Sequence, residues 1–161
     1  MNTGDARARF IADLRDEAAA FAAFHELLRT EQAALEARDI DALVTLAQVK
    51  SERVVVLNDL ARRRASWLAA HSLAADRAGM AQWLLTHGGA EQAQLSQLWH
   101  TLLDTAAAAQ AVNQVNGALI ETRLQHNQRL LGALLGGGQP SLYGPDGQTR
   151  VSGTRRDLGS V

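Results

Sequence analysis

The stretch LLRTEQAALEARDIDALVTLAQVKSERVVVL, residues 27–57, decides the fold of this chain. On both sides of Arg38, apolar residues recur at alternating spacings of three and four, which is typical of amphipathic helices. Asp39 is a good N-cap for the second helix, and Asp41 places a negative charge in its first turn, where the helix dipole favours it. A loop this short allows only an antiparallel connection. We therefore expect a hairpin of two long helices.

The hairpin predicts an ion pair between its two helices. Residues whose numbers add to about 81 lie level with one another in such a hairpin, so Glu31 faces Lys50. Lys50 is the only lysine among 16 basic residues. An ion pair in the apolar seam fixes the register of the helices and adds little net stability. We predict a structural role for this pair and no catalytic one, because no second acid–base group accompanies it.

The helical pattern continues outward from the hairpin in both directions. Toward the N-terminus it reaches back to Asp5, which can cap a first helix that ends near Ala37. Toward the C-terminus the second helix runs from Asp39 and weakens around Ser72. Each helix is therefore expected to span about thirty residues, far longer than the average of about 12.

Two further helical segments follow. Asp76 to His87 carries its apolar residues on one side and stops at Gly88-Gly89, so we expect a connector or small helix there. The third long pattern runs from Glu91 to Leu135 and contains NQVNG at residues 113–117. Asparagine and glycine weaken a helix, so this group needs a local reason. A buried asparagine that pins the helix register is one such reason, and Gly117 could allow a close helix crossing.

Composition supports an all-α fold and suggests two regions. Alanine (30) and leucine (24) make up a third of the 161 residues, as expected of helices. Both prolines and seven of the 13 glycines lie in residues 136–161. We predict an antiparallel helical bundle or elongated coiled coil of three long helices with a short connector helix in residues 1–135. A flexible C-terminal tail follows in residues 136–161.

The same composition excludes several functions. Without cysteine the chain has no disulfide, thiolate nucleophile or thiolate metal site. A net charge of −1 provides no field to attract nucleic acid or an anionic membrane. The N-terminus has no apolar signal region and the longest strongly apolar run, residues 18–24, is too short for a bilayer. We expect a cytoplasmic, non-catalytic protein with no cofactor, no metal and no membrane insertion.

Two local features have alternative interpretations. FHELLRT around His25 loosely resembles a helical phosphotransfer site, although His25 also falls in the apolar stripe, and a packed histidine is the simpler interpretation. The run Arg62-Arg63-Arg64 predicts a solvated helix face, or else a docking site for an acidic partner. No two of the five histidines are four residues apart, the spacing at which metal ligands share a helix face.

A second apolar row on the third long helix bears on function. Its residues are Ile120, Leu124, Leu131 and Leu135. The principal row of the same helix already faces the bundle, so the second row either lacks a partner in the chain or belongs to a wide bundle face. The members of the principal row are Leu95, Leu98, Leu102, Thr105, Ala109, Val112, Asn116, Leu119, Arg123, His126 and Leu130. The tail beyond it is poor in apolar residues, yet it contains Leu142 and Tyr143. Such a tail beside an exposed row is typical of a site that folds on binding.

The chain resembles the flagellar export chaperones of the FlgN family between about Phe24 and Gly147. Three blocks carry the resemblance. They are residues 27–57, quoted above, then NQVNGALIETRL at residues 113–124, and LYGPDGQT at residues 142–149. The positions that follow the family pattern are Leu27, Leu28, Glu31, Leu35, Asp39, Leu43, Leu46, Lys50, Asn113, Asn116, Gly117 and Ile120.

The resemblance implies a small helical protein that binds newly made hook-associated proteins at the hook–filament junction. It would cover their terminal amphipathic helices and deliver them to the flagellar type III export apparatus. The family's client-binding region maps onto about Ile120 to Tyr143. The candidate partner-binding residues are Ile120, Leu124, Leu131, Leu134, Leu135, Leu142 and Tyr143. An alternative function is a helical coiled-coil adaptor or scaffold that self-associates through its last helix.

Overall fold

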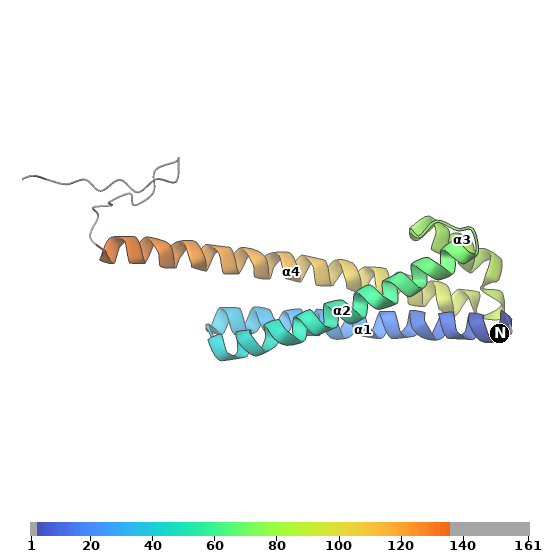
Figure 1. The fold of residues 1–161 in the computed structure, drawn as a ribbon, viewed down its shortest axis with the longest axis horizontal. Coiled ribbons are helices and arrows are strands. Elements are labelled where there is room, and N and C mark those ends of the chain that lie inside the picture. Colours follow the sequence, from blue (N-terminus) through green and yellow to red (C-terminus); the bar gives the residue numbers. More distant parts are fainter. Residues whose placement is uncertain (1–2, 136–161) are drawn as a thin grey trace, which may run out of the picture. The chain divides into compact units, whose positions relative to one another are not determined.

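A computed structural model describes residues 3–135, and all regular structure within that range is helical (Figure 1). The elements are α1 (Thr3–Ala37), α2 (Ile40–Ala70), α3 (Arg77–His87), the 3-10 turn η1 (Gly89–Glu91) and α4 (Gln92–Leu134). The all-α prediction is confirmed, including three long helices and a short connector helix. The predicted tail, residues 136–161, lies outside the described residues.

The chain divides into two compact units, residues 1–120 and a second unit that begins at Glu121. α4 contributes to both, because its residues up to Ile120 belong to the first unit. The boundary that composition suggested near residue 136 falls inside the second unit and stays a prediction.

The α1–α2 hairpin is closed by capping interactions at both helix ends. The Asp39 carboxylate accepts a hydrogen bond from the Ala42 N–H at 3.0 Å, so the predicted N-cap is confirmed. On the other side of the turn, Arg38 takes a left-handed conformation with φ of 60°. The Asp39 N–H bonds the Ala34 carbonyl, which completes a Schellman cap on α1.

The predicted start of α1 is wrong by three residues, because a cap at Asp5 would make Ala6 the first helical residue. The helix begins at Thr3, and Asp5 lies in its first turn and not at its cap. A carboxylate there still stabilises the helix, because the first turn carries the positive end of the helix dipole. The far end of α2 is closer to prediction: His71 caps it and Ser72 has a φ of 58°.

The hydrophobic core of the first unit lies where all four helices meet. α1 contributes its N-terminal half, α2 its C-terminal end and α4 its first turns, with α3 beside them (Figure 1). The buried members are Phe10, Ile11, Leu14, Leu68, Met80, Trp83, Leu84, Leu95, Trp99 and Leu102. Aromatic rings hold its centre, since Phe10 stacks on Trp67 with 4.9 Å between ring centroids and meets the edge of Trp83 at 4.6 Å.

Arg7 links α1 to the end of the connector helix α3. Its guanidinium donates to the carbonyl of Gly88 at 2.9 Å and to that of His87 at 3.1 Å. These carbonyls lie at the end of α3, where the last C=O groups of a helix have no N–H donor within the helix. Arg7 also pairs with Glu91 at 3.4 Å. The predicted stop at Gly88-Gly89 is confirmed, because α3 ends at His87 and Gly89 has a φ of 58°.

Candidate partner-binding surface and the interhelical ion pairs

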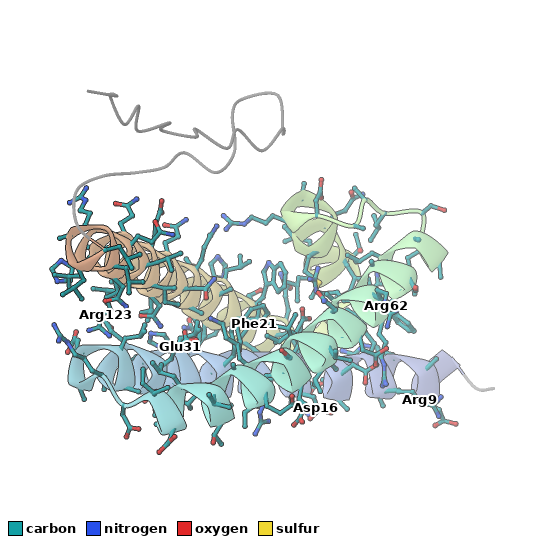
Figure 2. All side chains as sticks on the ribbon, turned by 60° about the vertical axis from the view of Figure 1, so that its left-hand side comes forward. Arg9, Asp16, Phe21, Glu31, Arg62 and Arg123 are labelled. Carbon is teal, nitrogen blue, oxygen red and sulfur yellow. The ribbon has the colours of Figure 1, made fainter. Side chains whose placement is uncertain are left out.

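Lys50 and Glu31 lie face to face in the hairpin, as the predicted register requires. The Lys50 Nζ donates to both carboxylate oxygens of Glu31, at 2.9 and 3.1 Å. Glu31 is only 7% exposed and points into the space between the helices in Figure 2. A bidentate contact of this kind is stronger than one between exposed side chains, because less water screens it.

Asn116 of α4 joins this pair from the third long helix. It is fully buried, and its Nδ2 donates to Glu31 Oε2 at 2.8 Å and to the Leu28 carbonyl at 2.9 Å. The sequence suggested a buried asparagine that pins register without indicating its partner. Glu31 thus binds a residue from each of the other two long helices, and α4 is continuous through the NQVNG group.

A second buried ion pair was missed at the sequence level. Arg64 donates to both carboxylate oxygens of Glu17, at 2.9 and 3.2 Å, and Glu17 is 1% exposed. The Arg64 guanidinium also lies 5.0 Å from the centre of the Trp99 ring, a cation–π contact. The prediction of a solvated face is therefore wrong for Arg64.

The signal for this second pair was present in the hairpin register. Both members are displaced from Glu31 and Lys50 by fourteen residues, which is four seam positions along an antiparallel coiled coil. The other two arginines of the run do lie on the surface. Arg62, labelled in Figure 2, and Arg63 both pair with Asp59. The hydrogen bond that the Arg63 guanidinium donates to the Asp59 carboxylate raises the pKa of Arg63 above its ordinary value, and the charges of Asp59 and Asp13 contribute further.

The candidate partner-binding residues that the structure describes are exposed. The fractional exposures are 49% for Ile120, 57% for Leu124, 59% for Leu131, 82% for Leu134 and 84% for Leu135. Asn116 is the last buried residue of α4 among those described. Leu142 and Tyr143 lie outside the described residues. Consecutive exposed leucines on one helix are unusual, because water penalises each of them by about 1.5–3 kcal/mol relative to a buried position.

Leu130 extends this exposed set beyond the prediction. It belongs to the principal apolar row of the third long pattern, which was expected to face the bundle, yet it is 49% exposed. The principal row is buried or half-buried only as far as Arg123. The spacing of the apolar row is the same before and after Arg123. Periodicity alone therefore could not show where along α4 the row changes from buried to exposed.

The described part of the chain offers little support for a metal site, a phosphotransfer site or a membrane-spanning helix. Among residues 3–135, no three His, Asp or Glu side chains are grouped so that they could hold a metal ion. His25 is partly buried on α1. None of the described helices combines the length and the hydropathy needed to cross a membrane.

Fold and surface together define an all-α protein of long antiparallel helices whose longest helix ends in exposed leucines. The chain belongs to the FlgN family, since the family model described as "FlgN protein" matches residues 1–150.

Relatives with assigned names agree with this membership. A flagella synthesis protein FlgN from Salmonella typhimurium is 36% identical over 58 residues, which cover 36% of this chain and 41% of the relative. The flagella synthesis protein FlgN of Proteus mirabilis is 38% identical over 58 residues, covering 36% of this chain and 40% of the relative. The alignments thus span about two fifths of each relative. No solved structure matches the chain.

Proposed function

We propose that this protein is a flagellar export chaperone that acts in the cytoplasm by binding, without catalysis. Its clients are the hook-associated proteins of the hook–filament junction. It covers their terminal amphipathic helices and delivers them to the flagellar type III export apparatus. Membership of the FlgN family supports this proposal, as do relatives named for flagella synthesis.

The observation that carries the proposal is the exposure of the leucines at the end of α4. Leu124, Leu131, Leu134 and Leu135 are each more than half exposed. Large contiguous apolar patches on soluble proteins usually mark interaction sites. A client whose terminal helices assemble only after export has apolar faces to cover beforehand, and an apolar helix face is a suitable partner for them.

Binding of this kind needs no nucleotide. An amphipathic client helix packs its apolar side against α4, using residues spaced three and four apart. Buried area and affinity are separable, because association also costs entropy and desolvation. A chaperone can therefore cover a long helix and still release it at the export apparatus.

The test is client binding by the full chain and by Leu131→Asp. Light scattering should show a monomer that forms a one-to-one complex with a purified hook-associated protein. Leu131→Asp should weaken the complex at least about a hundredfold, because it buries a charge in the apolar contact. The helical circular dichroism should stay unchanged, since Leu131 is 59% exposed.

A matched control is Leu85→Asp. Leu85 is 72% exposed on α3, so its replacement introduces the same charge outside the proposed surface and should leave client binding intact. Full binding by Leu131→Asp would contradict the proposed surface. A stable homotetramer that does not bind the client would instead favour the alternative function of a self-associating adaptor.

A further inference from the structure

No contact among the described residues explains why position 117 of α4 is a glycine. It lies in the interior of α4, where glycine destabilises a helix relative to alanine. A Cβ built at Gly117 would meet no other described atom within 4 Å, and the backbone is not left-handed there. Gly79 is the opposite case, because a Cβ at that position would collide with the backbone of Ala74.

The sequence suggested that Gly117 allows a close helix crossing. Within residues 3–135 no helix of the chain makes that crossing, since the space above Gly117 is open. The neighbouring Asn116 is fully buried against α1. Consecutive helix residues point about 100° apart, so Gly117 lies on an adjoining, exposed face of α4.

That exposed face continues to Ile120, one turn further along α4. Residues three apart share a helix face, and Ile120 is 49% exposed. Asn113, four residues before Gly117 on the same face, is exposed and polar. The apolar part of this face in the first unit therefore starts at Gly117, immediately before the first candidate partner-binding residue.

We propose that a helix of the flagellar client crosses α4 closely at Gly117 and places a large apolar side chain over it. This inference rests on the proposed function and extends its surface by one turn toward the N-terminus. Close approach requires a small residue, because axes of packed helices lie 8–10 Å apart depending on the side chains between them. The occupant is an amphipathic helix with a leucine, isoleucine or methionine at the crossing. A polar or extended segment would need no glycine there.

Gly117→Ala separates binding from folding, because its two effects have opposite signs. The added methyl group improves helix propensity, so Tm should rise by about 1–4 °C. It also overfills the crossing, so the full chain should bind a purified hook-associated protein about tenfold more weakly or worse. Gly117→Leu should weaken binding further without lowering the helical content.

Gly4→Ala is the matched control. Gly4 is an exposed glycine of α1 with no described atom near its missing Cβ. It lies outside the proposed client surface on α4, so an added methyl group should change client affinity less than about twofold.

The outcomes distinguish this inference from the proposed function. If the wild type binds no hook-associated protein, the proposed function fails and this inference fails with it. If the wild type binds and Leu131→Asp does not, the proposed function stands and the glycine variants decide. Unchanged binding by Gly117→Ala, equal weakening by Gly4→Ala, or a lowered Tm for Gly117→Ala would each overturn the close crossing alone.

Discussion

At the scale of single residues, Glu31 is the point where the three long helices meet. Its carboxylate accepts hydrogen bonds from Lys50 of α2 and Asn116 of α4, while its side chain is 9% exposed and that of Lys50 is 27% exposed. The Asn116 Oδ1 is buried without a hydrogen-bond partner among the described residues. Such a network costs desolvation, so its benefit lies in specifying one register.

Lys50→Met tests the energetic role of this network. Removing the ammonium group leaves the Glu31 carboxylate buried with only Asn116 as a side-chain partner, so the free energy of unfolding should fall by about 3 kcal/mol. The double variant Glu31→Leu with Lys50→Met should recover most of that loss, because no buried charge remains. Urea denaturation followed by circular dichroism measures both.

The double variant also tests whether the ion pair specifies register. A well-packed apolar pair at these positions permits neighbouring registers, so broader amide resonances should accompany its recovered stability. A single variant as stable as the wild type would show that Lys50 contributes nothing to the fold.

At the scale of helices, the ends are determined by short local signals. Asp39 and Asp76 each cap a helix by accepting from an N–H three residues on. α1 and α2 both end in Schellman caps, at Arg38 and Ser72, where non-glycine residues adopt positive φ. Left-handed backbone costs these residues energy, so the tight turns that they form must be held by the packing of the adjoining helices.

Gly79→Ala tests how α3 is seated. The Asp76 carboxylate accepts from the Gly79 N–H at 2.8 Å, which draws the first turn of α3 against the preceding loop. A methyl group at Gly79 would collide with the Ala74 backbone, so the loop or α3 must shift. We expect a loss of at least about 2 kcal/mol in the free energy of unfolding. Fluorescence of the buried Trp83 should report the displaced helix, and an unchanged spectrum and Tm would contradict this account.

At the scale of the whole molecule, charge and apolar surface indicate what kind of contact the protein makes. The net charge is −1, so no long-range field attracts a charged partner. Exposed leucines lie on α4. The buried carboxylates of Glu31 and Glu17 are paired with basic residues of the first unit itself. We therefore expect a partner to be recognised by apolar contact and shape.

Client binding should accordingly depend weakly on salt and strongly on temperature. Between about 0.1 and 0.5 M NaCl the Kd should change less than about threefold, because few charges are screened. The heat capacity change of binding should be negative, as burial of apolar surface requires. Calorimetric titration at several temperatures measures both, and a steep rise of Kd with salt would indicate an electrostatic interface.

The sequence by itself determined the helices, the hairpin and the ion pair between Glu31 and Lys50. These features depend on periodicity and on caps a few residues long, and an antiparallel loop converts them into a register. That register also placed Glu17 opposite Arg64, although the arginine run concealed it. Helix bounds were predicted to within three residues for the same reason, because capping is local.

Only the tertiary structure decided which faces of α4 are covered. Asn116 contacts residues of α1 that precede it by 85 and 88 positions, and no local pattern relates them. Leu130 keeps the spacing of a buried row and is exposed. Among the described residues, no other helix crosses close to Gly117. Burial of a helix face depends on how far the neighbouring helices extend alongside it. The sequence of the helix itself does not contain that information.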